Sequence, residues 1–313
     1  MSRTSFEPDR GGAYWLVLTP SVDDVAWRRE LERAVEEAGL KMMSLVEGGD
    51  APDYGNPDLV ILTDDALAPM IAGAGPGRVA AVMPEPGTAH EKLEDKLGIV
   101  APQSVWHSSI LLARAMDLAP LHRVVTAAEL ARRPQSIRLL DRFTIRPPRS
   151  AAELPRRPAI HAAFLIYDSV QPRQEPVHWS DRLFTYDERA TRGASDWGVL
   201  DITGRPRMLV YGPYLALPPG MWRARIRFGV DKDAAGHQYR VDWGTRTACV
   251  SEYVTPGAPG IYEIDLDFEW TSTDAAEIRL ILTEGSFMGT LLFQGMTVAR
   301  TPGTWPTADR AAA

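Results

Sequence analysis

The chain has 313 residues but only one cysteine and six histidines, so it is poor in side chains that form disulfides or bind transition metals. A single cysteine excludes an internal disulfide and any zinc site built from several thiolates. Cys249 falls in an apparent strand, where a free thiol packs as a small apolar group, so we expect it to be buried. The histidines are scattered along the chain, and we expect no metal site and no cofactor.

Long apolar runs and an excess of positive charge are also missing. No stretch of about 18 apolar residues occurs, so the sequence predicts no membrane span. The net charge of -7 and the pI near 5.5 disfavour nucleic acid as the main partner. The first twelve residues lack the apolar segment of a secretory signal, which predicts a cytoplasmic location. Nothing in the composition fixes an oligomeric state.

The first part of the chain, residues 10–120, alternates short apolar runs with helical patterns. Ser21 and Asp24 form a capping-box pattern before a helix that Gly39 ends. Further helices are expected over 90–98 and 104–119, and a short helix or a turn is expected over 66–75. Strands are expected over 13–20, 40–47, 57–63, 77–84 and 99–102. Strands that alternate with helices pair in parallel, so we expect an α/β domain with a doubly wound sheet in flavodoxin-like order.

The segments PDLVILTDDALAP and ILLARAMDL in this domain resemble a response-regulator receiver domain. That family has an acidic pair after the first strand, a phosphoacceptor aspartate after the third and a lysine after the fifth. Here Thr19, Thr63 and Ala101 occupy these positions, so the metal-binding carboxylates and the cation are incomplete. The resemblance therefore implies a pseudo-receiver that has lost phosphorylation, and a plain flavodoxin-like scaffold is the alternative.

Residues 121–159 are rich in proline and arginine, and we interpret them as a connector. The prolines prevent a long continuous element, although Thr126 and Glu129 favour a short helix over 126–133. From residue 160 the period changes to two. Residues 303–313 are expected to form a flexible tail.

The second domain, residues 160–302, is predicted to be an antiparallel β-sandwich. Its strands are short, have turn residues between them and show no helical pattern. They are expected over 159–170, 181–188, 207–217, 222–230, 238–244, 247–254, 261–270, 276–285 and 290–300.

Two of these strands carry complementary charges on one face. The strand 222–230 has Arg223, Arg225 and Arg227, and the strand 261–270 has Glu263, Asp265, Asp267 and Glu269. Unlike charges favour cross-strand pairing, so we predict that the two strands are neighbours or near neighbours in the sheet, with a charged outer face. A calcium site on the acidic row is disfavoured, because side chains in a flat row diverge.

The segments GPYLALPPGMWRARIRF and LLFQGMTVAR are similar to jelly-roll domains related to carbohydrate-binding modules. Related domains accompany glycosyltransferases and other polysaccharide machinery in bacteria. The resemblance implies a non-catalytic accessory protein of bacterial surface-polysaccharide biology, whose sandwich binds a glycan or a partner protein.

A sugar ring needs an exposed aromatic face with polar groups beside it. Trp197 with Asp196, in a segment rich in turn residues, is the first candidate, although a loop tryptophan that plugs the end of the sandwich is equally consistent. Trp222 and Trp270 alternate inward and are expected in the core. The other candidates are Trp243, Tyr239 and Trp179.

No catalytic motif stands out, and we favour a binding protein over an enzyme. The sequence contains neither G-x-S-x-G nor H-E-x-x-H, and no spacing pairs two carboxylates for glycoside hydrolysis. The alternative is a glycan-active transferase or hydrolase with its site at the carboxyl ends of the parallel strands, where open α/β sheets bind ligands. Its residues would be Ser21, Asp23, Asp64, Asp65 and Glu85.

Overall fold

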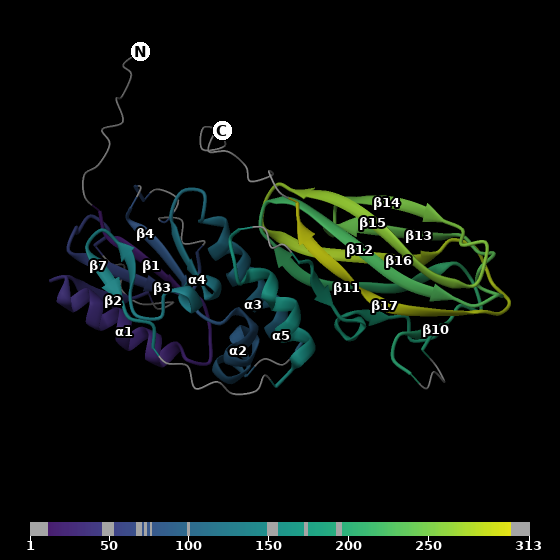
Figure 1. Cartoon of the computed structure of the whole chain (residues 1–313), viewed down its shortest axis with the longest axis horizontal. Coiled ribbons are helices and arrows are strands. Elements are labelled where there is room, and N and C mark those ends of the chain that lie inside the picture. The colour runs from purple at the N-terminus through teal and green to yellow at the C-terminus, as the bar shows by residue number, and fades with distance from the viewer. Residues whose placement is uncertain are drawn as a thin grey trace, which may run out of the picture. The chain divides into compact units, whose positions relative to one another are not determined.

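The computed structural model divides the chain into two compact units, each described here by itself (Figure 1). The first unit comprises Met1–Ser104, Arg114–Leu154 and Tyr167–Val170, and the second comprises Val105–Ala113, Pro155–Ile166 and Gln171–Ala313. The structure describes residues 12–45, 53–66, 71, 74–75, 77–98, 101–148, 156–171, 175–191 and 196–301. The predicted tail at 303–313 lies outside these ranges, as does most of the segment 66–75, for which a short helix or a turn was predicted.

A five-stranded parallel sheet with helices forms the first unit, which confirms the predicted α/β class. Its strands are β1 (Tyr14–Leu18), β2 (Lys41–Ser44), β3 (Leu59–Thr63), β4 (Val79–Met83) and β5 (Arg123–Thr126). The helices are α1 (Asp24–Glu37), η1 (Pro86–Thr88), α2 (Ala89–Leu97), α3 (Gln103–Asp117, divided between the units) and α4 (Ala127–Arg132). A hairpin of β6 (Ile137–Leu140) and β7 (Phe143–Ile145) follows. No helix in the described ranges is long and apolar enough to cross a membrane.

The strand order is β2-β3-β1-β4-β5, which differs from the flavodoxin-like order 2-1-3-4-5 that we expected. The burial of the strands explains the difference. β3 is buried over most of its length and suits an interior place beside β1, whereas β2 exposes Lys41, Met43 and Ser44 and lies at the edge. A receiver domain has the flavodoxin-like order, so this sheet does not support that resemblance.

The segment 121–159 contains more structure than a connector requires. The segment Arg123–Thr126 forms β5, the fifth strand of the sheet. The fifth strand was predicted over 99–102 instead. Ala101 and Pro102 lie in a turn, and residues 99–100 lie outside the described ranges. The helix predicted over 126–133 is present as α4, but the side chain of Thr126 makes no capping hydrogen bond. The capping box at Ser21 is also wrong, because Asp23 is the residue that precedes α1.

Two antiparallel sheets form the β-sandwich of the second unit, which confirms the second half of the predicted fold class. The β12 sheet has the order β10-β17-β12-β15, with β8 also paired to β17, and the β16 sheet has the order β14-β13-β16-β11-β9 (Figure 1). The strands are β8 (Val177–Trp179), β9 (Thr185–Tyr186), β10 (Val199–Asp201), β11 (Arg207–Leu217), β12 (Gly220–Val230), β13 (Tyr239–Gly244), β14 (Cys249–Val254), β15 (Gly260–Trp270), β16 (Asp274–Leu282) and β17 (Thr290–Arg300).

The sandwich begins differently from the prediction. Residues 159–170 were expected to be a strand, but they form α5 (Pro158–Phe164) followed by the 3₁₀ helix η2 (Leu165–Tyr167). Pro158 stands in the first turn, where its fixed backbone angle favours a helix start, and three alanines add helix propensity. Likewise, 181–188 contains the 3₁₀ helix η3 (Asp181–Leu183) before the two-residue strand β9.

Indole rings dominate the core between the two sheets. Trp222 and Trp270 are buried, as predicted. The ring of Trp243 lies 5.0 Å from that of Trp270 and 6.2 Å from that of Trp179, measured between centroids. Cys249, by contrast, is exposed, because it starts the edge strand β14, of which most residues face solvent. The expectation of a buried thiol is therefore wrong.

Candidate functional site

The two charged strands of the β12 sheet are neighbours, as the sequence predicts. The antiparallel register pairs Arg223 with Asp267, Arg225 with Asp265 and Arg227 with Glu263. The first two pairs are bidentate, with nitrogen–oxygen distances between 2.7 and 2.8 Å. These hydrogen bonds raise the pKa of Arg223 and of Arg225, and the bond from Arg225 lowers the pKa of Asp265. Both guanidinium groups are thus committed to their cross-strand partners.

The third pair, Arg227 and Glu263, is not joined by a short hydrogen bond. Arg227 Nη1 lies 3.8 Å from Glu263, and Glu263 lies 4.0 Å from Arg225 as well. The glutamate side chain is one methylene longer than aspartate and reaches between the two arginines. Within the described residues, Arg227 makes this one long ion pair, and its guanidinium donates no hydrogen bond. Arg227 is therefore a cation with donors to spare.

A β-bulge lies across the strand from Arg227. The register of β12 and β17 shifts between Ile226, which pairs with Met296, and Phe228, which pairs with Phe293. Two residues of β17, Gln294 and Gly295, consequently face the single residue Arg227. Gly295 has a φ of 84°, the left-handed conformation typical of a bulge glycine. Such bulges re-aim side chains and interrupt the regular surface of a sheet.

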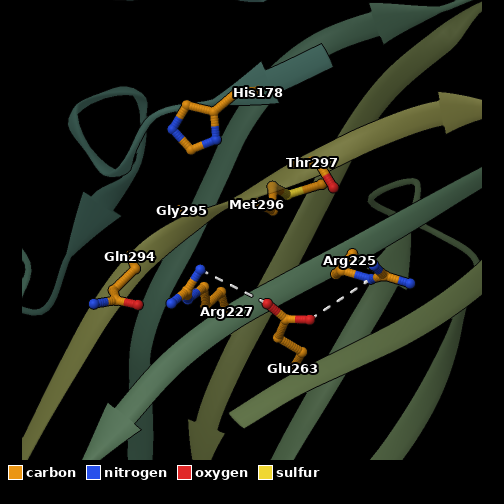
Figure 2. A pocket seen from close by; sticks show the side chains of 8 residues that line it. All are labelled: His178, Arg225, Arg227, Glu263, Gln294, Gly295, Met296 and Thr297. Atoms are coloured by element: carbon orange, nitrogen blue, oxygen red, sulfur yellow. Dashed lines mark ion pairs between the residues drawn. The ribbon is translucent and has the colours of Figure 1, made fainter. Parts of the chain in front are cut away.

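A groove of about 400 Å³ opens at this bulge on the outer face of the β12 sheet (Figure 2). Its side chains offer a carboxylate, two guanidinium groups, an imidazole, an amide and a hydroxyl, so nearly every kind of hydrogen-bonding group is present. The amide oxygen of Gln294 is buried and has no hydrogen-bond partner in the described part of the chain. The lining residues are His178, Arg225, Arg227, Glu263, Gln294, Gly295, Met296 and Thr297.

The bulge depends on glycine at position 295. A Cβ there would lie 2.5 Å from the carbonyl oxygen of Trp179, and a left-handed φ itself costs about 1–2 kcal/mol for a residue with a Cβ. We expect Gly295→Ala to lower the free energy of unfolding by that amount plus about 1–3 kcal/mol for the clash. Gly257→Ala is the matched control, since Gly257 has a φ of 78° and no atom within 4 Å of its Cβ position. Equal losses in denaturant unfolding would show that the groove floor is not tightly packed.

Trp197 is not among the residues that line the groove, and it is exposed, at 56%. Its indole packs edge-on against Tyr186, at 5.8 Å between centroids, and hydrogen bonds to the Tyr186 hydroxyl. The backbone N–H of Phe293 donates to the carbonyl of Gly198 at 2.8 Å, so the backbone that follows Trp197 runs beside β17 at the residue before Gln294. Asp196 is exposed as well. The structure thus leaves Trp197 and Asp196 accessible to a ligand.

The other three predicted ligand residues are core residues, and their selection was wrong. Trp243, Tyr239 and Trp179 are fully buried. The indole of Trp243 donates to the carbonyl of Trp222 at 3.2 Å, and the hydroxyl of Tyr239 donates to the carbonyl of Ala234 at 2.9 Å. The polar atoms of Trp243 and Tyr239 are thus satisfied inside the sandwich, whereas the buried indole nitrogen of Trp179 has no hydrogen-bond partner in the described residues. No face of these rings can reach a sugar.

The alternative site at the carboxyl ends of the parallel strands is brought together only in part. Ser21 follows β1 and Glu85 follows β4, and these strands are adjacent. The two loops are linked by the backbone N–H of Val22, which lies 3.4 Å from the hydroxyl oxygen of Thr88. Ser21 is buried, and its hydroxyl has no hydrogen-bond partner in the described residues, whereas Asp23 is half-buried.

Asp64 and Asp65, which follow β3, are held by cations. Lys96 lies 3.0 Å from Asp64, and Arg114 lies 3.2 Å from Asp65. The residues described by the structure include no group of three or more histidine, cysteine or acidic side chains placed to hold a metal ion. The acidic cluster that magnesium-assisted phosphoryl transfer requires is therefore not assembled there.

We expect no phosphorylation of Asp64 or Asp65 by acetyl phosphate and magnesium. Ion pairing occupies both carboxylates, and Thr63 stands where the phosphoacceptor would be. Intact-mass spectrometry checks this, with a receiver domain that has a complete acidic site as the positive control. An added mass of one phosphoryl group on this chain, lost on hydroxylamine treatment, would contradict the expectation.

The groove residues His178, Gln294 and Thr297 were missed by sequence reasoning. Each lies in a strand whose residues look ordinary, and a bulge has no periodic pattern. The one local signal is Gly295, a glycine inside the apolar run LLFQGMTVAR. A glycine in a strand interior often marks a bulge.

Comparisons with known proteins leave the family of the chain open. No family model matches the sequence, and no curated protein matches it. Among solved structures, a carbohydrate-binding module in complex with beta-1,4-galactotriose is 12% identical over 38% of this chain and 87% of its own, with a TM-score of 0.26. A family 16 carbohydrate-binding module is 10% identical over 35% and 81%, with a TM-score of 0.25. The xylan-binding domain CBM22-1 of Xyn10C from Paenibacillus barcinonensis is 10% identical over 42% and 84%, with a TM-score of 0.23. At such identities and TM-scores, these similarities assign no ligand to this chain.

Proposed function

We propose that the β-sandwich binds a glycan in the groove of the β12 sheet, with Trp197 as an aromatic platform at its end. The observation that carries this proposal is the groove of about 400 Å³ lined by hydrogen-bonding side chains, and the exposed indole of Trp197 precedes the backbone contact between Gly198 and Phe293 of β17. A sugar presents hydroxyl groups at its rim and C–H bonds on its face. The first require donors and acceptors, and the second require an aromatic surface.

The side chains at the bulge support a polar occupant. Gln294 lines the groove, and its amide group can donate hydrogen bonds to a ligand hydroxyl. Thr297 and His178 lie on the neighbouring strand positions, opposite each other in the register of β8 and β17, and offer further hydrogen bonds.

The chemistry of the groove favours binding over hydrolysis. Its lining contains one carboxylate, Glu263, which lies between two guanidinium groups. Glycoside hydrolysis ordinarily uses two carboxyl groups about 5–10 Å apart, one of them able to donate a proton. We therefore favour a non-catalytic accessory protein of bacterial surface-polysaccharide biology, and a partner protein is the other occupant that the groove would accept.

A glycan array probed with the full chain tests the proposal, together with a thermal-shift screen of nucleotide sugars. Binding to one class of array glycan, with no stabilisation by nucleotide sugars, is the expected result. Stabilisation by a nucleotide sugar without glycan binding would instead favour the alternative, a transferase site near Ser21 and Glu85.

A further inference from the structure

We infer that the glycan unit bound in this groove carries a carboxylate, which makes the ligand a polysaccharide that contains hexuronate residues. The inference rests on the proposed glycan function and deepens it. The third arginine of β12 is paired less closely than the two before it. Arg223 and Arg225 each hold a carboxylate through two short hydrogen bonds, whereas Arg227 has one ion contact at 3.8 Å.

The first two pairs show what this surface does with a carboxylate. A guanidinium fork and a carboxylate make two parallel hydrogen bonds, the strongest and most directional pairing available to arginine. Arg227 has the same fork but lacks a partner that reaches it closely. Its side chain is half exposed, at 50%, so a ligand carboxylate can approach without displacing a protein group.

The bulge determines where such a carboxylate would sit. Gly295 has no side chain, and Gln294 lies beside it across from Arg227, so the space next to the guanidinium is open (Figure 2). In the close view, Arg227 stands between Gln294 and Glu263. A carboxylate on the side of Gln294 therefore meets Arg227 while it stays away from Glu263. The ring hydroxyls of the same sugar would then face Gln294 and Thr297.

Hydrogen-bonding capacity, and not an excess of positive charge, is what the groove offers an acidic ligand. Asp265 neutralises Arg225, and Glu263 is a distant counter-charge for Arg227 at 3.8 Å. The donors of Arg227 are nevertheless unused within the described residues, and a guanidinium fork suits a carboxylate better than any neutral hydroxyl.

Isothermal titration of the full chain with matched oligosaccharide pairs tests the inference. The probes are oligogalacturonate, oligoglucuronate and oligomannuronate, each as the free acid and as its methyl ester, which keeps the ring but removes the charge. One acid form should bind at least about tenfold more tightly than its ester, as expected for a charge-assisted bidentate contact, and the preference should shrink as salt is raised.

Arg227→Gln should abolish the preference for the acid form over the ester. Arg227→Lys should retain only part of it, because a lysine keeps the charge but loses the fork. Arg223→Gln is the matched control, since Arg223 belongs to the same ladder but does not line the groove, and it should leave the preference unchanged. Equal melting temperatures of Arg227→Gln and Arg223→Gln would show that the loss is not a folding defect.

The remaining outcomes separate this inference from the proposed function. Equal binding of acid and ester, lost in Trp197→Ala, would overturn the carboxylate and leave glycan binding intact. Binding of a sulfated oligosaccharide such as a heparin fragment, with no binding of any uronate, would also overturn it. A chain that binds neither the acids, nor the esters, nor any glycan of the array would remove both proposals.

Discussion

Trp243→Ala is expected to lower the free energy of unfolding of the sandwich by about 3–5 kcal/mol, the range typical of a large aromatic truncated in a core. The side chain is fully buried and lies against Trp179 and Trp270. Its removal leaves a cavity between the sheets and leaves the carbonyl of Trp222 without the indole donor. Denaturant unfolding followed by circular dichroism measures the loss.

Trp106→Ala serves as the matched control for that experiment. Trp106 is 41% exposed, and an exposed residue away from special features usually changes stability by no more than about 0.5 kcal/mol. A loss below about 1 kcal/mol for Trp243→Ala would mean that the indole is not part of the core, and Trp243 would return as a ligand candidate.

Trp197→Ala is expected to behave in the opposite way, with a large loss of binding and a small loss of stability. More than half of the side chain is exposed, and its main packing contact is with Tyr186, so we expect a stability change of about 1 kcal/mol or less. An aromatic side chain that a ligand stacks on as its anchor typically contributes at least about 2 kcal/mol, so affinity for the array glycan should fall by about thirtyfold or more.

Titration calorimetry of the purified variant, at a temperature well below its melting point, measures that affinity. Trp106→Ala should bind as the unchanged chain does, because Trp106 does not line the groove. If Trp197→Ala instead loses several kcal/mol of stability, the indole is a plug at the end of the sandwich, and the binding site would have to rely on the groove alone.

The charged face of the sandwich could be predicted because it follows from local geometry. Side chains alternate along a strand, so the sequence itself separates the outer arginines of β12 from its buried residues, and unlike charges then select the neighbouring strand. The observed register of Arg225 opposite Asp265 agrees with that reasoning. Alternation is local, and the complementary charge rows identified each other although Arg223 and Asp267 are 44 residues apart in the sequence.

The buried tryptophans could not be separated from exposed ones by their sequence neighbours. Trp243 stands between Asp242 and Gly244, residues that usually indicate a turn. Asp242 is nevertheless buried, because its carboxylate accepts hydrogen bonds from Arg240 at 2.7–2.8 Å and from Ser251 at 2.8 Å. A carboxylate satisfied by residues on its own and the adjacent strand is compatible with a core position, and the sequence alone does not reveal that arrangement.

The strand order and the groove needed tertiary information for a different reason. Both β2 and β3 looked like strands of a parallel sheet, and only their relative burial decides which one lies at the edge. The groove depends on a single extra residue in β17 that shifts the register opposite Arg227. Such a shift changes no residue type and no period, so the sequence does not distinguish Gln294 and Thr297 from other strand residues.

Two tyrosines on the other sheet of the sandwich form an alternative aromatic surface for a glycan. Tyr211 and Tyr214 lie on β11 of the β16 sheet, and Tyr214 has a φ of 64°, unusual for a residue with a side chain. Its hydroxyl donates to Glu277 at 3.2 Å, and burial together with that carboxylate raises the pKa of Tyr214 to about 12. The hydroxyl therefore remains a donor at any physiological pH.

Chemical-shift mapping by nuclear magnetic resonance, with the glycan selected on the array, tests the central claim most directly. We expect the largest changes at the side-chain amide of Gln294 and at the indole N–H of Trp197, with smaller changes at Thr297. The β16 sheet should remain unperturbed. Changes confined to Tyr211, Tyr214 and their neighbours would contradict the account, because the glycan would then occupy the other sheet of the sandwich.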